Sequence, residues 1–183
     1  MNKTLLLRSQ MAVLAVFACA FATTASAQTK KPDPAEQAVL LGQFGDWGAY
    51  KATPGGKKIC FALSKPTSAT TDPAGRNRDP SYVFVSTRPA EKVKNEVSVI
   101  VGYPQKAGYD AAASIGSAHY VMYTQNDGAW VKNAADEARM VEAMRKGADA
   151  VIKAITSKGT QTTDTFSLKG IAQALDRVSQ ECR

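Results

Sequence analysis

The stretch FGDWGAYKATPGGKKICFALSK, residues 44–65, decides the fold class. Two segments rich in apolar and aromatic residues flank Pro54-Gly55-Gly56, and glycine accepts the positive φ angles that a tight turn needs. The stretch therefore predicts a β-hairpin. Side chains alternate along a strand, so the second strand has one face of large apolar residues and one face of small residues. These are Ile59, Phe61 and Leu63 on the first face, and Cys60, Ala62 and Ser64 on the second.

Outward from this hairpin, further alternating segments predict more strands. They are SYVFVSTR (81–88), NEVSVIVGY (95–103), IGSAHYVMYT (115–124), AWV (129–131) and ADAVIKAITSKGTQTTDTF (148–166). Turns are expected at Asn126-Asp127-Gly128 and at Lys158-Gly159. The segment 66–80, rich in Pro, Gly, Thr and Asp, predicts a long loop.

Two segments have the periodicity of helices. ADEARMVEAMRKG, residues 135–147, has acidic residues in its first turn, an apolar stripe of Met140, Val141 and Met144, and a closing glycine. The segment 167–183 predicts a C-terminal helix with Ser167 as its N-cap.

The apolar residues of the C-terminal helix recur at spacings of four, three and four and share one face. They are Ile171, Leu175, Val178 and Cys182. We expect this face to lie on the small face of the hairpin's second strand, where Cys182 can bond to Cys60.

The N-terminus has the three parts of a secretory signal peptide. Lys3 and Arg8 are basic, residues 11–21 are apolar, and Ala25-Ser26-Ala27 is a cleavage motif. We therefore expect residues 1–27 to be removed and the mature chain to be periplasmic, secreted or held at the cell surface. The apolar run is shorter than the roughly 20 residues that span a bilayer, so no transmembrane segment is expected in the mature chain.

Removal of the leader also removes Cys19, which leaves an even pair of cysteines. In an oxidising compartment such a pair predicts a disulfide between Cys60 and Cys182. We expect a flexible linker over residues 28–40 and a single domain over residues 41–183.

The formal net charge is +7 and falls to +5 without the leader. A positive balance favours anionic partners, although scattered positive charges also serve solubility. The candidate contacts with an anionic envelope or host component are Arg76, Arg78, Arg88, Lys92 and Lys94. Arg76 and Arg78 are expected in an exposed loop, where charge reversal leaves folding intact. Export argues against nucleic acid as a partner.

Aromatic residues near glycines offer a second candidate site. Trp47, Tyr50 and Trp130 could form a platform on which a sugar stacks. The alternative is that Trp47, which alternates with small neighbours, packs in the core, and we favour it.

Residues for catalysis or metal binding are sparse. His119 is the single histidine, and a triad with Asp46 or Asp127 and a serine would also need an oxyanion hole. Asp164 has no second acidic residue at metal-ligating spacing and is expected to form hydrogen bonds at a turn. We therefore predict no catalytic residues, no metal and no cofactor.

Several motifs occur in a characteristic order along the chain: FGDW, RPAEKVKNEVSVIVGY, AWV, AMRKG and SKGTQTTDTFSLKGIAQAL followed by a cysteine. In these the chain resembles the invasion-associated locus B family of exported alphaproteobacterial proteins, over residues 44–182. The resemblance implies a mainly β, immunoglobulin-like antiparallel sandwich, with a short helix and a C-terminal helix packed on one sheet. It also implies a periplasmic or surface role linked to host-cell invasion, with no established catalytic activity.

Three functions are consistent with these observations. The leading hypothesis is a non-enzymatic exported binding module that acts through its basic surface and the 66–80 loop. The alternatives are an envelope-structural or chaperone-like protein and, less favoured, an unrecognised hydrolase.

Overall fold

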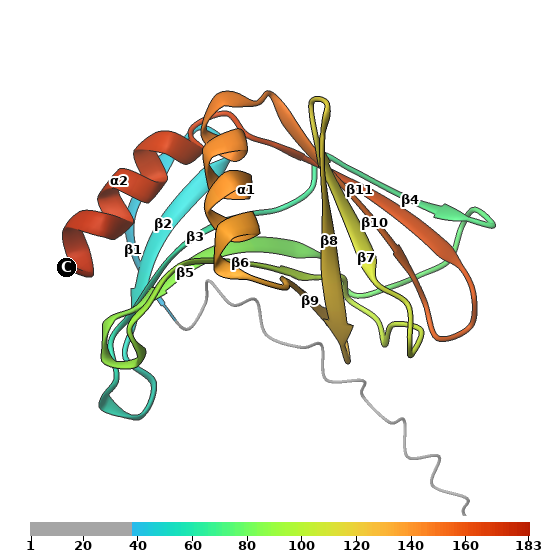
Figure 1. The fold of residues 1–183 in the computed structure, drawn as a ribbon, viewed down its shortest axis with the longest axis horizontal. Helices are drawn as coiled ribbons and strands as arrows, with labels where there is room; N and C mark the ends of the chain where they lie inside the picture. The colour runs from blue at the N-terminus through green and yellow to red at the C-terminus, as the bar shows by residue number, and fades with distance from the viewer. Residues whose placement is uncertain (1–37) are drawn as a thin grey trace, which may run out of the picture. The chain divides into compact units, whose positions relative to one another are not determined.

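The computed structural model describes residues 38–183, which form eleven strands, two α-helices and two short 3-10 turns (Figure 1). The predicted leader and most of the predicted linker lie outside the described residues; Val39 and Leu40, at the linker's expected end, already belong to the first strand. The elements are β1 (Val39–Phe44), β2 (Trp47–Ala52), β3 (Ile59–Ser64), β4 (Ser68–Asp72), β5 (Tyr82–Arg88), β6 (Val93–Ile100), β7 (Ala111–Ile115), β8 (Ala118–Gln125), β9 (Gly128–Val131), α1 (Ala134–Lys146), β10 (Asp149–Ile155), β11 (Gln161–Ser167) and α2 (Ile171–Glu181).

All strands join one antiparallel sheet in the order β1-β2-β3-β5-β6-β9-β8-β7-β10-β11-β4. The sheet bends, and side chains from both of its halves and from both helices meet in one core cluster. The predicted mainly β, antiparallel class with a helix packed on the sheet is confirmed. The sandwich is built from one bent sheet, whose free edges are β1 and β4.

The predicted hairpin is β2–β3, in which Tyr50 pairs with Phe61 and Lys51 with Cys60. Its turn contains Gly55 and Gly56, both with positive φ. The two faces of β3 also divide as predicted. Cys60 and Ala62 lie in the main core, while the large residues of β3 join a second apolar cluster on the opposite face of the sheet.

Helix α2 packs against β1, β2 and β3, on the face where β3 has small side chains. Ile171, Leu175 and Val178 are each 1% exposed. The predicted disulfide is present: Cys60 and Cys182 are bonded, with their Cα atoms 5.9 Å apart. The helix that closes the chain is therefore held to the hairpin by apolar packing and by a covalent bond.

Helix α1 lies against four consecutive strands of the sheet, β6, β9, β8 and β7. The Asn133 side chain caps it by accepting a hydrogen bond from the Asp136 backbone N–H at 2.9 Å, and the predicted apolar stripe is buried. The Glu137 carboxylate accepts a hydrogen bond from the Val97 backbone N–H at 2.8 Å. Burial raises the pKa of Glu137 above its ordinary value of 4.5.

Three expectations about local structure are wrong. The predicted loop 66–80 contains strand β4, which pairs with β11. The predicted strand 115–124 is present from Ala118 onward as β8, but its predicted start is wrong: Ile115 ends a separate strand, β7, which pairs with β8 as a hairpin. Ser167 does not cap α2, because it still pairs with Asp149 at the end of β11, and Gly170 with a φ of 96° stands at the N-cap.

Three aromatic side chains of the sheet each cover a glycine two residues earlier. A Cβ atom on Gly48 would come within 2.5 Å of the Tyr50 ring, and one on Gly128 within 2.2 Å of the Trp130 ring. Phe44 lies over Gly42 in the same way, at 3.0 Å. These glycines provide the space in which the rings lie flat on the sheet.

Candidate functional site

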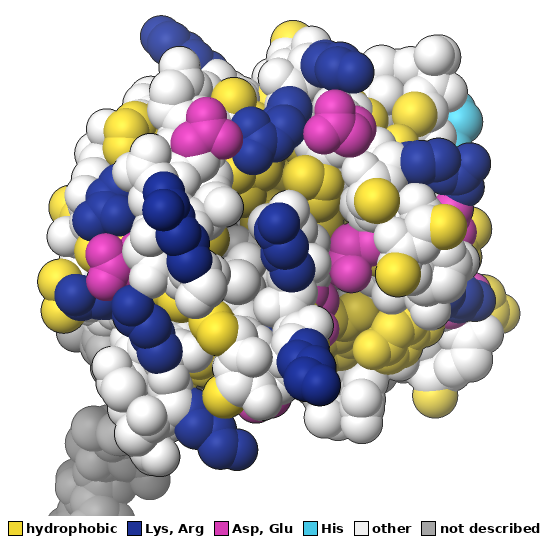
Figure 2. Space-filling view, turned by 60° about the vertical axis from the view of Figure 1, so that its left-hand side comes forward, with side chains coloured by type: hydrophobic (Ala, Val, Ile, Leu, Met, Phe, Trp, Pro, Cys, Tyr) yellow, Lys and Arg dark blue, Asp and Glu magenta, His cyan; other side chains and the backbone are white. Residues whose placement is uncertain are grey.

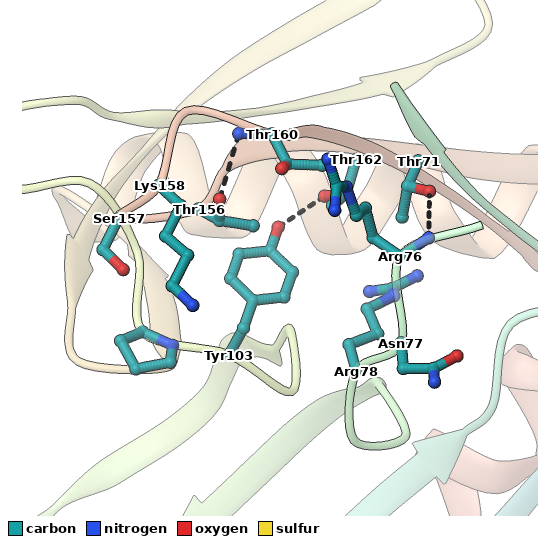
Figure 3. Close-up of a pocket in the computed structure, with 11 residues that line it drawn as sticks. Thr71, Arg76, Asn77, Arg78, Tyr103, Thr156, Ser157, Lys158, Thr160 and Thr162 are labelled. Atoms are coloured by element: carbon teal, nitrogen blue, oxygen red, sulfur yellow. Dashed lines mark hydrogen bonds between the residues drawn. The ribbon is translucent and has the colours of Figure 1, made fainter. Parts of the chain in front are cut away.

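A polar cavity of about 500 Å³ lies beside the β4 edge of the sheet. Residues 73–80, which we call the strap, form one wall, and the turn between β10 and β11 forms another (Figure 3). We call this cavity the first hollow. Its lining consists of hydroxyl, amide and cationic side chains with one tyrosine and one proline: Thr71, Arg76, Asn77, Arg78, Tyr103, Pro104, Thr156, Ser157, Lys158, Thr160 and Thr162.

A buried ion pair holds the strap in place. The Arg78 guanidinium donates to both carboxylate oxygens of Asp164 on β11, one of them at 2.8 Å, and to the Val101 carbonyl at 3.0 Å. The Asp164 side chain is 1% exposed and that of Arg78 11%. The expectation that Arg78 is an exposed loop residue is therefore wrong, and Asp164 lies in a strand rather than at a turn.

Two further contacts fix the path of the strap. The Asp79 backbone N–H donates to the Gly102 carbonyl at 3.1 Å. Gly102 has a φ of 77°, and a Cβ atom there would come within 2.1 Å of the Asp79 carbonyl oxygen. Only glycine allows both this conformation and this approach. At the other side, the Arg76 backbone N–H donates to the Thr71 hydroxyl at 3.3 Å.

The opposite wall, the β10–β11 turn, is also well anchored. Its predicted turn at Lys158-Gly159 is observed: the Gly159 backbone N–H donates to the Thr156 carbonyl at 2.8 Å, and the Ser157 N–H donates to the Pro104 carbonyl at 2.9 Å. The Thr160 N–H donates to the Thr156 hydroxyl at 3.0 Å. Lys158 is thus carried on a turn with fixed ends.

Tyr103 stands between these walls (Figure 3). Its hydroxyl is hydrogen-bonded to the Thr162 hydroxyl, and the Arg78 guanidinium lies 5.9 Å from the centre of its ring. Burial raises the pKa of the Tyr103 hydroxyl, so the tyrosine is neutral at physiological pH. It offers a rigid aromatic wall.

The lining of the first hollow contains three cationic side chains and no carboxylate. The charge of Arg78 is neutralised by Asp164. Arg76 and Lys158 are exposed, and within residues 38–183 no ion pair is recorded for either of them. The first hollow therefore has a positive potential that comes from these two side chains.

A second hollow, of about 700 Å³, lies on the other side of the strap. Both hollows are lined by Thr71, Arg76, Asn77 and Arg78. The second hollow is further lined by the apolar residues Pro66, Ala69 and Ala74 and, unlike the first, by both a lysine and a carboxylate, Lys65 and Asp79. The strap therefore divides one recessed region into two adjacent compartments.

The structure separates the five residues predicted to contact an anionic partner. Arg76 and Arg78 belong to the strap, which precedes β5, whereas Arg88, Lys92 and Lys94 lie at the far end of β5 and the start of β6. A strand of this length spans about 23 Å. Arg88 is bonded to Glu91 at 2.7 Å and to Glu96 at 2.9 Å, and the hydrogen bond with Glu96 chiefly holds the pKa of Arg88 above its ordinary value.

Lys92 and Lys94 are exposed. Figure 2 shows that, over the face it presents, basic side chains are spread among acidic ones and do not form one continuous patch. Independently of that face, the first hollow is distinguished by a lining that contains no carboxylate.

The three residues predicted as an aromatic platform are also apart. Trp47 is fully buried and donates its indole N–H to the Ser167 carbonyl at 2.8 Å, as the core-packing alternative requires. Tyr50 stacks on Phe61, and Trp130 stacks on Tyr123. Between β2 and β9, which carry Tyr50 and Trp130, the sheet places β3, β5 and β6.

His119 has one partner of catalytic type. Its Nδ1 atom is 3.0 Å from the Ser114 hydroxyl across the β7–β8 hairpin, at an exposed position. Asp127 lies past the opposite end of β8, and Asp46 lies in the β1–β2 turn. Within residues 38–183 no group of three His, Cys, Asp or Glu side chains is placed to hold a metal ion.

Several lining residues were not predicted as functional, among them Tyr103, Lys158 and the threonines. The sequence places Tyr103 in a strand and Lys158 in a turn, and neither position indicates a role in binding. The polar TTD sequence, which occurs at 70–72 and again at 162–164, is the one sequence signal for the polar strands that line the hollow. The threonines of β4 and β11 come together because these strands pair, and Tyr103 and Lys158 are brought to them by the Tyr103–Thr162 and Ser157–Pro104 hydrogen bonds.

The fold and the site define a disulfide-closed, mainly β domain with a cationic, hydroxyl-lined recess at one sheet edge. The family model described as "Invasion associated locus B (IalB) protein" matches residues 48–179. The chain therefore belongs to the invasion-associated locus B family. None of the curated proteins and none of the solved structures compared with the chain matches it. Among the described residues, no helix has the length and apolar character that crossing a membrane requires.

Proposed function

We propose that this protein is an exported, non-enzymatic binding module that recognises an anionic component of the cell envelope or of a host surface. The observation that carries this proposal is the charge of the first hollow. It combines hydroxyl and amide groups and no carboxylate with two cations, Arg76 and Lys158, that have no ion-pair partner within residues 38–183. Such a lining attracts an anion and offers it hydrogen bonds.

Export is supported by two observations. The N-terminal sequence has the parts of a secretory signal peptide, and the domain is closed by a disulfide, which is typical of oxidising compartments. Membership of a family named for its association with invasion is in keeping with a role outside the cytoplasm.

The non-enzymatic part of the proposal is supported by the state of the reactive side chains. Asp46 and Asp127, the candidate acid partners of His119, lie in the β1–β2 and β8–β9 turns. The Tyr103 hydroxyl is hydrogen-bonded to the Thr162 hydroxyl. Arg78 and Asp164 neutralise one another. The polar groups of the hollow are arranged to hold a ligand, and none forms a nucleophile–base–acid series.

Salt-dependent retention tests the proposal. The mature protein is passed over immobilised outer-membrane vesicles and over heparin beads at increasing NaCl concentration. Retention that falls steeply between low and physiological salt is expected, because screening weakens contacts between exposed charges. Retention that does not change with salt contradicts an anionic partner and favours the envelope-structural or chaperone-like alternative.

Crosslinking in living cells identifies what the protein contacts. A lipopolysaccharide or an acidic glycan among the captured species supports the proposal. Capture of envelope proteins alone, at salt-independent yield, contradicts it.

A further inference from the structure

We propose that the two hollows beside the strap are adjacent subsites for a linear oligosaccharide that bears carboxylate groups. This inference rests on the proposed function and names the class of ligand. It assigns the first hollow to one acidic sugar unit, the second hollow to its neighbour, and Arg76 to the junction between them.

The recess has room for two adjacent sugar units. The two hollows measure about 500 and 700 Å³ and share the residues of the strap and Thr71. Pockets of about 300–1,000 Å³ hold ligands of drug size, which is the size of one or two sugar units. Because the hollows are open and adjacent, a chain can continue from one to the other across the strap, whereas a small inorganic anion would fill neither of them.

The walls of the first hollow match the chemistry of a sugar. A sugar presents hydroxyl groups around its rim and C–H groups on its faces. The first hollow offers matching groups: hydroxyls of Thr156, Ser157 and Thr160, the Asn77 amide, and the neutral ring of Tyr103. A site built for a phosphate group alone has no use for an aromatic wall or for so many hydroxyls.

The charges of the first hollow favour an acidic sugar. Lys158 enters the first hollow from the β10–β11 turn, and Arg76 lines both hollows from the strap. Arg78 is neutralised by Asp164, so Lys158 and Arg76 are the cations that can pair with carboxylates of the ligand. An arginine fork and a lysine ammonium both bind carboxylates through charge-assisted hydrogen bonds. Neutral oligosaccharides would leave both cations unpaired.

The walls of the recess are rigid. The strap is fixed by Arg78 to β11 and by Asp79 to Gly102, and the opposite turn is fixed by Ser157 to Pro104. The walls are therefore formed before the ligand arrives, which lowers the entropic cost of binding.

Calorimetric and NMR titration of the mature protein tests this inference. The probes are galacturonate tetrasaccharide, galacturonate monosaccharide, maltotetraose as a neutral match, and inorganic phosphate. We expect the acidic tetrasaccharide to bind at least about tenfold more tightly than the monosaccharide, because it reaches both hollows. Maltotetraose should bind at least about tenfold more weakly than the acidic tetrasaccharide. Shifted NMR signals should map to both hollows.

Two variants locate the site. Lys158→Gln and Arg76→Gln are each expected to weaken binding of the acidic tetrasaccharide about tenfold, the usual loss for a charge-assisted contact. Lys153→Gln is the matched control: this lysine is exposed on β10 and does not line either hollow, so affinity should be unchanged.

Three results would overturn the inference: binding of the acidic tetrasaccharide that both variants leave intact, phosphate binding as tightly at the same residues, or no binding of the tetrasaccharide. Retention on vesicles and heparin separates the two proposals. If the double variant Arg76→Gln/Lys158→Gln keeps salt-sensitive retention, the proposed function stands and the site lies elsewhere. If the wild type shows no salt-sensitive retention but binds the tetrasaccharide, the subsites stand and the wider proposal of an envelope or host-surface partner fails.

Discussion

The two edges of the sheet are held in different ways. At the β1 edge, helix α2 covers β1, β2 and β3 with an apolar face and is bonded to β3 through Cys60–Cys182. At the β4 edge, the strap is held by the Arg78–Asp164 ion pair and a few backbone hydrogen bonds. Glu181 of α2 also forms ion pairs with Lys51 and Lys58 of the hairpin, but partly exposed pairs of this kind contribute little. Apolar burial and the covalent bond therefore carry most of the stability at this edge, whereas the polar anchor at the other edge leaves hydroxyls and cations open to a ligand. The domain thus separates the part that stabilises it from the part that we propose binds.

Loss of the disulfide should produce the largest effect and would test the stabilising edge. The bond joins residues 122 positions apart, and for a loop of about this length the chain-entropy model gives about 5 kcal/mol. Cys182→Ser is expected to lower the free energy of unfolding by up to this amount, measured by urea titration. The terminal helix should become the first site of protease cleavage.

Peptide mapping of the exported protein under non-reducing conditions provides the control. Two free thiols, or a bond between two molecules, would contradict the bond in the structure. Under fully reducing conditions the wild type and Cys182→Ser should unfold at the same urea concentration.

Removal of the ion pair should have the next largest effect and would test the polar edge. Arg78→Ala leaves the buried Asp164 carboxylate without its cation, which typically costs about 3 kcal/mol. Arg76→Ala is the matched control on the same strap, since Arg76 is exposed and its loss should change stability by no more than about 0.5 kcal/mol. Equal stabilities of the two variants would show that the strap needs no such anchor.

Gly102→Ala should have a smaller effect, confined to the strap. Its Cβ atom would collide with the Asp79 carbonyl, and strain at a positive φ costs about 1–3 kcal/mol. We expect hydrogen–deuterium exchange of the strap to accelerate while that of α2 stays unchanged. Faster exchange in α2 would mean that the two edges are coupled and that the separation described above is incorrect.

Glu137→Gln should produce the smallest change in stability. It removes the charge of a side chain that lies between the two edges, while the size of the side chain stays the same. Burial raises the pKa of Glu137, so the folded state favours the protonated carboxyl. The contribution of this group to the free energy of unfolding is therefore fully present below its unfolded pKa and is lost as pH rises through its folded pKa. The glutamine variant keeps an acceptor for Val97 and carries no charge, so it should be slightly more stable than the wild type at pH 7. Urea titrations across pH should show the difference disappearing below about pH 4.5. A difference that grows at low pH would contradict this assignment.

The stabilising edge could be predicted from the sequence because its determinants are local. Alternation along β3 and periodicity along α2 each define one face, and the two remaining cysteines lie on those faces. Both the packing and the disulfide follow from these patterns. The prediction that Ser167 caps α2 is wrong because Ser167 belongs to β11 and pairs with Asp149 of β10. Capping preferences alone do not reveal this pairing.

The candidate site could be predicted only in part because its residues converge through long-range pairing. Arg76 was assigned correctly to an exposed segment, but Arg78 was assigned the same role. Nothing in the local sequence shows that Asp164, 86 positions away, will be buried beside it. Strand β4 was not predicted because its sequence, SATTD, has no alternation of apolar and polar residues. An edge strand whose two faces are both near solvent does not need such alternation.

The glycines beneath Phe44, Tyr50 and Trp130 have a consequence for how this sequence can change over evolutionary time. Since a single methyl group at Gly48 or Gly128 would displace the ring two positions later, a substitution at either glycine is tolerated only with a change of its aromatic partner. The glycine and the aromatic residue of each pair should therefore covary among homologues: a sequence that lacks one of them should also lack the other.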